Sequence, residues 1–345
     1  MFLENLGADE QLRHLFHPYA QQGLQLGRIC FASHEQYSVY LETGLYDALP
    51  TGRLRFDDTL PAVGDWVAAR QVDQTFALIE EVLPRRTKFS RTAAGTGNRE
   101  QVIAANIDLA LIVCGLDHDF NLRRLERYLV LARESRAAAL VVLNKFDLCA
   151  DPEEPAAQVR AIAPAVLLLS AHKSVAPLLP FVKGKTVAML GSSGAGKSTI
   201  ANGLLGENKQ ETAAVRKHDS RGRHTTTSRM LIPLPSGGAL IDNPGMRELQ
   251  LWASESALDD VFAEITTVAQ NCHYADCTHQ SEPKCAVQAA LASGLLDQAR
   301  WQSYQKLEKE LKFQQRANDK QTMLAEKQKW KAIHKAMRHH PKYRR

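Results

Sequence analysis

The stretch "GSSGAGKST", residues 191–199, constrains the fold of this chain more than any other feature. It satisfies the pattern G-x-x-x-x-G-K-[ST], whose four defining positions hold Gly191, Gly196, Lys197 and Ser198. Glycines allow backbone N–H groups to turn around phosphate oxygens, and a helix that starts at the lysine points its positive end at the same anion. The apolar run "TVAML" precedes the loop and a helix-compatible stretch follows it, so the sequence predicts a strand, a phosphate-binding loop and a helix.

Apolar runs of strand length lie on both sides of this loop. They read "IDLALIVC", "AALVVLN", "AVLLLS", "TVAMLG", "MLIPLP" and "ALIDN" in chain order. Helix-compatible stretches such as "NLRRLERYLVLARES" and "STIANGLLG" separate several of them. Buried strands that alternate with helices are typical of a mostly parallel sheet covered on both faces. The sequence therefore predicts an α/β domain.

The segment "VVLNKFDL", residues 141–148, indicates which base the domain reads. The Asp147 carboxylate can accept hydrogen bonds from the ring N–H and the exocyclic amine of guanine, while Asn144 meets the O6 side and the Lys145 stem lies along the base. Adenine presents the opposite donor pattern and would leave a desolvated carboxylate unpaired, which is costly. "SAH", residues 170–172, suits a backbone contact to O6. We therefore expect GTP in preference to ATP.

Two further segments point to a magnesium ion bound with the nucleotide. "ALIDNPG" ends an apolar run at Asp242, which is placed to hold Mg²⁺, and Gly245 can turn its backbone toward the γ-phosphate. The loop "RGRHTTTS" offers a threonine hydroxyl; we favour Thr226, although Thr225 and Thr227 remain open. With the Ser198 hydroxyl, the expected magnesium ligands are thus Ser198, Thr226 and Asp242.

The residues that we expect to bind GTP fall in four separate segments. They are Asn144, Lys145, Phe146, Asp147, Ser170, Ala171, Gly191, Ser192, Ser193, Gly194, Ala195, Gly196, Lys197, Ser198, Thr199, Asp242 and Gly245. The two base-reading segments precede the phosphate loop, whereas an ordinary GTPase has the phosphate loop first. This order indicates a circular permutation, in which the same sheet is built from a chain opened at another place.

The regions on either side of the α/β domain differ from it. Short strand-like runs in residues 20–90, "LQLGRICFA", "YSVYLETG", "GRLRF", "DWVAARQ" and "FALIEEVL", predict a small barrel of the oligonucleotide-binding (OB) type. "RTAAGTGNREQ", residues 91–101, is interpreted as a polar connector. Beyond about residue 255 the pattern is helical, with apolar residues at spacings of three and four.

Three cysteines and a histidine in the C-terminal region predict a metal site. Cys272, Cys277, His279 and Cys285 form the pattern C-x4-C-x-H-x5-C. Three thiolates and one imidazole make a closed tetrahedral shell, which is typical of a structural Zn²⁺ ion. His273 is spare and is expected at the surface. One zinc ion per chain would fold this small domain rather than catalyse a reaction.

The positive charge of the chain is concentrated in its last segment. From Trp301 to Arg345 there are 13 Lys and Arg against 4 Asp and Glu, a net charge of +9, whereas the whole chain carries +5. Residues 1–300 therefore carry a net charge of −4. A basic extension is typical of nucleic-acid binding; the alternative is a solvated helix.

These motifs together resemble the ribosome small-subunit-dependent GTPase A family of circularly permuted bacterial GTPases. "GRHTTT" and the cysteine spacing carry the resemblance, which covers nearly the whole chain. It implies an OB-fold barrel at residues 1–95, a permuted GTPase domain at 96–255 and a zinc-binding helical domain at 256–345.

The resemblance also implies a function. The GTP-bound protein would bind the 30S subunit and its 16S rRNA late in maturation, and 30S-stimulated hydrolysis to GDP would release it. We expect a cytoplasmic protein with no membrane association, because the chain has no apolar run of about 18 residues and no signal peptide at its start; we also expect a monomer.

The catalytic group and the substrate leave alternatives open. Met246 stands where many GTPases place a water-orienting glutamine, and a thioether cannot orient water. We therefore expect His224 to position the water, the alternative being a loop histidine that contacts rRNA. A competing hypothesis is an RNA-binding module in which hydrolysis is incidental, and a third is a GTPase that acts on another RNA such as tRNA.

Overall fold

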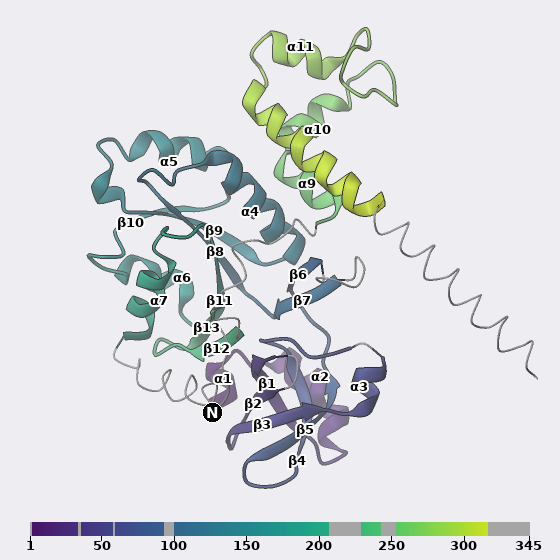
Figure 1. Cartoon of the computed structure of the whole chain (residues 1–345), viewed down its shortest axis with the longest axis vertical. Coiled ribbons are helices and arrows are strands. Elements are labelled where there is room, and N and C mark those ends of the chain that lie inside the picture. Colours follow the sequence, from purple (N-terminus) through teal and green to yellow (C-terminus); the bar gives the residue numbers. More distant parts are fainter. Residues whose placement is uncertain are drawn as a thin grey trace, which may run out of the picture. The chain divides into compact units, whose positions relative to one another are not determined.

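The computed structural model describes residues 2–33, 36–57, 59–92, 100–206, 229–242 and 253–316. The chain divides into two compact units (Figure 1). The first consists of Met1–Ser90 and Val102–Leu249, and the second of Arg91–Gln101 and Gln250–Arg345. Among the described residues no helix is long and apolar enough to cross a membrane.

A closed five-stranded barrel forms the N-terminal part of the first unit. Its strands are β1 (Gln25–Ala32), β2 (Tyr37–Leu41), β3 (Gly44–Pro50), β4 (Trp66–Gln71) and β5 (Phe76–Val82). They pair in the order β1-β2-β3-β5-β4, and β4 returns to pair with β1, which closes the barrel. Ile29, Val39, Leu41, Val67 and Ile79 are fully buried in its core. The barrel predicted from the sequence is confirmed.

One barrel strand was predicted at the wrong place. "GRLRF" is not a strand but the short helix α3 (Gly52–Phe56), which buries Leu54 and exposes Phe56. The missing strand is β3, the preceding segment, which pairs antiparallel with β2 and parallel with β5. Alternating arginine and apolar residues fit either structure over five residues, and the pairing partners decide between them. Two further helices, α1 (Phe2–Asn5) and α2 (Glu10–Ala20), precede the barrel.

The second part of the first unit is a six-stranded α/β sheet. Its strands are β8 (Leu109–Gly115), β9 (Ala138–Asn144), β10 (Val166–Leu169), β11 (Lys185–Leu190), β12 (Arg229–Pro233) and β13 (Gly238–Asp242). Their spatial order is β10-β9-β8-β11-β13-β12. All neighbours are parallel except β12 and β13. The carboxyl ends of β8, β9, β10 and β11 therefore meet at one edge.

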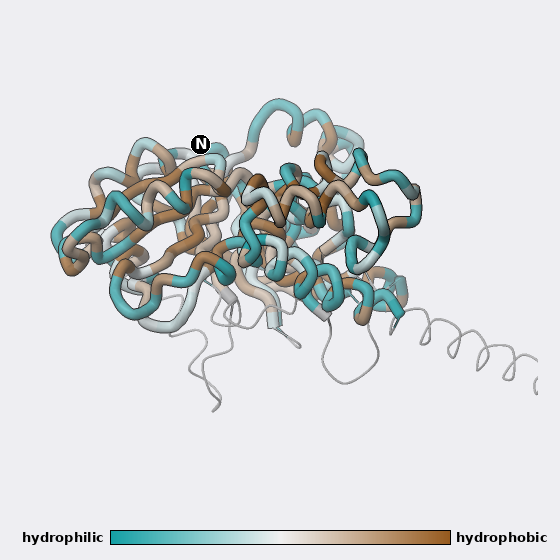
Figure 2. The backbone as a smooth tube through the Cα atoms, turned by 90° about the horizontal axis from the view of Figure 1, so that it is seen from above, coloured by the Kyte–Doolittle hydropathy of each residue, from teal (hydrophilic) through white to brown (hydrophobic). Residues whose placement is uncertain are grey.

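Helices cover both faces of this sheet (Figure 1). They are α4 (Leu122–Ser135), α5 (Glu153–Arg160), α6 (Leu179–Val182) and α7 (Lys197–Leu205). Leu111 and Val113 of β8 pack in one core cluster with Val182 of α6 and Ile200 of α7. Intervening residues of β8 point to the other face, where α4 contacts β8 and β9. Figure 2 shows the hydrophobic stretches of the first unit running inside it.

The barrel and the α/β sheet are joined through strand β1. Phe31 pairs with Met230 of β12, so the two sheets form one continuous eleven-stranded sheet. Arg28 of β1 is buried, donates to the Thr186 hydroxyl of β11 at 2.7 Å and lies 4.7 Å from the centre of the Trp66 ring. Burial lowers the pKa of Arg28 to about 10. The strand that carries the phosphate loop is thus bonded directly to the barrel.

The remaining described elements are a two-stranded sheet and a set of helices. Strands β6 (Lys88–Thr92) and β7 (Glu100–Ala105) form a separate two-stranded sheet, so both ends of the predicted connector lie in strands. The second unit contains α9 (Glu255–Val261), α10 (Ala263–Ala269), α11 (Ala286–Ala292) and a further helical stretch at residues 298–316. Phe262, Ile265, Trp301, Leu307 and Leu311 are buried in it.

Candidate functional site

The predicted phosphate loop connects the end of β11 to the start of α7, and its glycines are needed for their backbone shape. Gly191 has φ +145° and a Cβ there would lie 2.2 Å from the Val113 carbonyl oxygen of β8. Gly194 and Gly196 have φ +81° and +101°, which L side chains rarely adopt. Any other residue at Gly191 would push the loop away from β8.

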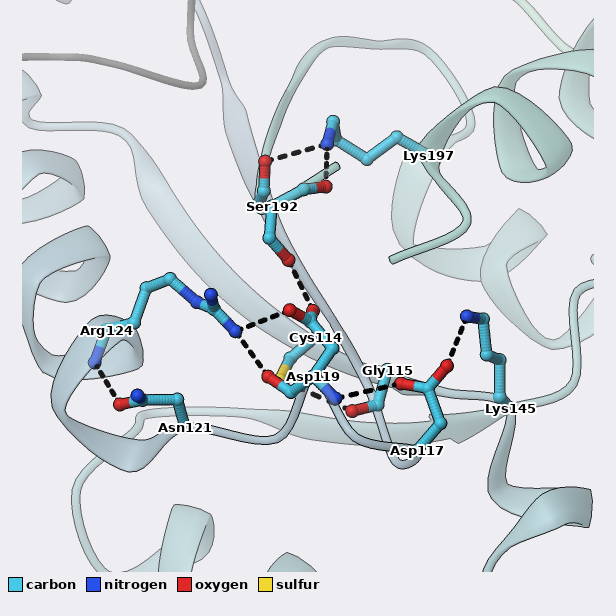
Figure 3. Close-up of polar contacts among 10 residues, drawn as sticks. Cys114, Gly115, Asp117, Asp119, Asn121, Arg124, Lys145, Ser192 and Lys197 are labelled. Carbon is cyan, nitrogen blue, oxygen red and sulfur yellow. Dashed lines mark hydrogen bonds and ion pairs between the residues drawn. The ribbon is translucent and has the colours of Figure 1, made fainter. Parts of the chain in front are cut away.

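Lys197 lies over its own loop. Its Nζ donates to the Gly191 carbonyl oxygen at 2.7 Å and also to that of Ser192 (Figure 3). Ser198 and Thr199 follow in the first turn of α7 and are exposed. Asp242 is half-buried at the end of β13, the strand next to β11. Ser198 follows β11 and Asp242 ends β13. Two of the three expected magnesium ligands thus lie at the carboxyl ends of neighbouring parallel strands.

Asn144 joins three loops of the site. It ends β9, is 3% exposed, and its Nδ2 donates to the Ala195 carbonyl oxygen of the phosphate loop at 2.9 Å. Its Oδ1 accepts from the Ala171 N–H of "SAH" at 3.0 Å. A Cβ at Gly196 would lie 2.1 Å from the same Nδ2, so a glycine is required for this contact. The segments predicted to read the base and to bind the phosphates therefore lie together.

The other residues that we predict to read the base differ in their exposure. Asp147 is exposed, and the Ser170 hydroxyl, with smaller effects of Lys173 and His172, holds the pKa of its carboxyl below the usual value. This carboxylate is therefore ionised at neutral pH and can accept hydrogen bonds. Phe146 is half-buried, while Ser170 and Ala171 are buried.

Two carboxylates that no sequence motif singles out also border the site. Lys145 Nζ forms an ion pair with Asp117 Oδ2 at 2.5 Å, which lowers the pKa of Asp117 (Figure 3). Asp119 accepts a hydrogen bond from the Ser192 hydroxyl of the phosphate loop. Both follow β8, which lies between β9 and β11. That position, directly after a strand beside the phosphate-loop strand, is the sequence signal that could have found them.

The four predicted metal ligands converge in the second unit. Their ligand atoms all lie within 4.8 Å of one another, with Cys272 Sγ 3.4 Å from His279 Nδ1 and 3.9 Å from Cys285 Sγ. Zinc bonds of about 2.0–2.3 Å place tetrahedral ligands roughly 3.3–3.8 Å apart. The donor set and its spacing fit such an ion, so the cluster could hold a metal. His273 is exposed and packs edge-on against Tyr274.

Several predicted functional residues lie outside the described part of the chain. They are His224, Thr225, Thr226, Thr227, Gly245, Met246 and the basic residues beyond residue 316. Their expected roles stay predictions.

Replacing Asn144 by alanine should disturb the assembly of the site. The change leaves the Ala195 carbonyl and the Ala171 N–H without their partner in a buried place, which costs about 1–3 kcal/mol. We expect the free energy of unfolding of the nucleotide-free protein to fall by that amount in urea denaturation, together with weaker GDP binding. Asn271→Ala, which removes only an exposed hydrogen bond to Thr267, is the control and should unfold like the wild type. Equal stability of all three proteins would contradict the role given to Asn144.

Comparison with known proteins agrees with this architecture. The family model described as RsgA GTPase matches residues 82–252. A protein of Opitutus terrae named small ribosomal subunit biogenesis GTPase RsgA is 46% identical over 98% of this chain and 97% of its own length. A protein of the same name from Leptospira interrogans is 42% identical over 94% of this chain and 92% of its own length.

Two solved structures share the fold. YjeQ from Thermotoga maritima has a TM-score of 0.60 at 23% identity, covering 82% of this chain and 97% of that chain. YloQ, described as a circularly permuted GTPase, has a TM-score of 0.58 at 25% identity, covering 86% of this chain and 96% of that chain. The predicted fold class, a circularly permuted GTPase domain with an N-terminal barrel and a C-terminal cluster that could bind zinc, is thereby confirmed. The chain belongs to the RsgA GTPase family, whose members hydrolyse GTP.

Proposed function

We propose that this GTPase binds the 30S ribosomal subunit through 16S rRNA, acts late in the maturation of that subunit, and is released when GTP is hydrolysed to GDP. The observation that carries the proposal is the identity of 46% and 42%, over nearly the whole chain, to relatives named small ribosomal subunit biogenesis GTPase. The N-terminal barrel and the net charge of +9 after residue 300 support contact with RNA. We further propose a cytoplasmic monomer.

In the proposed site the base and the phosphates are bound by residues on different strands. Asp147 accepts from the guanine ring N–H and amine, and the Lys145 stem lies along the base. Lys197 exchanges the loop carbonyls for the β- and γ-phosphate oxygens, which the backbone N–H groups of residues 191–199 surround. Lys197 thus has hydrogen-bond acceptors both before and after the nucleotide binds.

Magnesium would be held by Ser198, Thr226 and Asp242, and would neutralise charge on the phosphates when it is bound. His224 is the proposed group that orients the attacking water, because Met246 cannot do so. Because Met246 stands where many GTPases have a water-orienting glutamine, turnover by the protein alone should be slow.

The permuted chain order offers a physical route by which GTP hydrolysis could be coupled to release from the 30S subunit. Asp242 ends β13, the last strand of the α/β sheet among the described residues, and the next described helix is α9 of the second unit. A γ-phosphate-dependent change at Gly245 would thus be passed covalently to the unit that carries the metal cluster and the basic segment. The competing function is a GTP-dependent module that binds another RNA and hydrolyses GTP only incidentally. Such a module would not need a covalent connection between Gly245 and the second unit.

GTP turnover should depend on the 30S subunit. We expect slow hydrolysis by the purified protein alone, with 50S subunits or with bulk tRNA, and strong stimulation by 30S subunits only. Binding to 30S should be tight with a non-hydrolysable GTP analogue and weak with GDP. His224→Ala should lose the stimulation while keeping GDP affinity. Equal turnover under all conditions would contradict the ribosomal function, and full 30S-stimulated turnover of the variant would contradict the role of His224.

The metal cluster should hold one Zn²⁺ per chain and stabilise the second unit. Cys285 is both a ligand candidate and the N-cap of α11, where its sulfur accepts from the Gln288 N–H. Cys285→Ala should lose zinc in elemental analysis and lower the helical circular dichroism signal, because structural zinc sites contribute folding free energy. Cys149→Ala, a half-buried cysteine outside the cluster, should keep both. Retention of stoichiometric zinc by Cys285→Ala would contradict the proposed site.

A further inference from the structure

The segment after β8, residues 116–121, lies between the base-reading loop and the phosphate loop. β8 pairs with β9 on one side and with β11 on the other, and the Leu116 N–H donates to the Asn144 carbonyl oxygen at 2.8 Å. Its side chains therefore reach both loops, as Figure 3 shows for Asp117 and Asp119. None of these residues belongs to a nucleotide-binding motif.

On the phosphate side, Asp119 bonds two partners with its two carboxylate oxygens. Oδ2 accepts from the Ser192 hydroxyl, and Oδ1 accepts from the Arg124 guanidinium at 2.6 Å. Arg124 also donates to the Asp119 carbonyl oxygen and lies in the first turn of α4, where its N–H is capped by Asn121 at 3.0 Å. Helix α4, which packs on the sheet, thus holds the Asp119 carboxylate, and this carboxylate in turn holds the Ser192 hydroxyl.

On the base side, Asp117 completes the same segment. Its Oδ2 pairs with Lys145, and its Oδ1 accepts from the Asp119 N–H at 3.1 Å. Each of the two carboxylates therefore has a cation beside it, Lys145 for Asp117 and Arg124 for Asp119. This pairing limits the repulsion that two carboxylates would exert on the phosphates of a nucleotide.

We propose that Asp119 is a positioning residue for GTP binding, which fixes the start of the phosphate loop through the Ser192 hydroxyl. The inference rests on the proposed nucleotide site. A loop that is already fixed before the nucleotide arrives does not have to be ordered on binding, so the bound nucleotide is held longer. In the proposed site Asp119 touches neither the base nor the phosphates; it acts through Ser192.

Nucleotide dissociation measures this role directly. Ser192→Ala removes the hydroxyl, and Asp119→Asn removes the negative charge, so that Ser192 and Arg124 lose their bonds to a charged acceptor. Each variant should release a fluorescent GDP analogue about tenfold faster, because the phosphate loop loses its hydrogen bond to a charged group. Because both changes act on the same bond, the double variant should be no faster than the faster single variant.

The control and the contrary outcomes separate this role from a merely structural one. Glu153→Gln, which breaks an exposed ion pair with Arg160 on α5, makes the same carboxylate-to-amide change and should dissociate GDP like the wild type. Wild-type dissociation rates in both single variants, or a double variant about a hundredfold faster than the wild type, would overturn the proposal. A lower melting temperature of Asp119→Asn with an unchanged GDP dissociation rate would assign Asp119 to α4 alone and also overturn it. Failure of the wild type to bind GDP would instead overturn the nucleotide site itself.

Discussion

Two hydrogen bonds of the buried Asn144 side chain hold the segments of the site together. The side chain bonds the phosphate loop through the Ala195 carbonyl and the "SAH" segment through the Ala171 N–H, over separations of 51 and 27 residues. The contact with Ala195 requires that β9 lie two strands away from β11 with β8 between them, and that residue 196 have no Cβ; the contact with Ala171 requires that β10 lie beside β9. Circular permutation changes which segments are consecutive in the chain but leaves this spatial order of strands in place. The site is therefore assembled as one unit although its base-reading segments come first.

Local patterns predict the elements of this protein well where burial alone decides them. The apolar run "AALVVLN" coincides with β9, and "NLRRLERYLVLARES" contains α4, because a buried strand and an amphipathic helix each have a distinct pattern. The metal cluster is likewise predictable, since its four ligands lie within fourteen residues and their spacing suits a turn and a helix N-terminus. The barrel strand placed at "GRLRF" is wrong because a five-residue stretch does not contain the information on its pairing partner.

Contacts between distant segments set the limit of prediction from one sequence. Ser192 and Asp119 are 73 residues apart, and only the pairing of β8 with β11 brings them together. The same holds for Arg28, whose bond to Thr186 spans 158 residues and joins the barrel to the strand that leads into the phosphate loop. The motifs identify the atoms that should meet the nucleotide, whereas the contacts that hold those atoms in place emerge only from the folded sheet.

The base specificity of Asp147→Asn tests the proposed guanine-nucleotide site most directly. In the proposed site the wild-type carboxylate would accept from both the ring N–H and the exocyclic amine of guanine; an asparagine can accept from the ring N–H and donate to the carbonyl that xanthine carries in place of the amine. Isothermal titration of both proteins with GDP and xanthosine diphosphate should show a reversed preference, with GDP favoured by the wild type and xanthosine diphosphate by the variant. An unchanged preference would mean that residues 144–147 do not read the base, and would contradict the assembled guanine-nucleotide site.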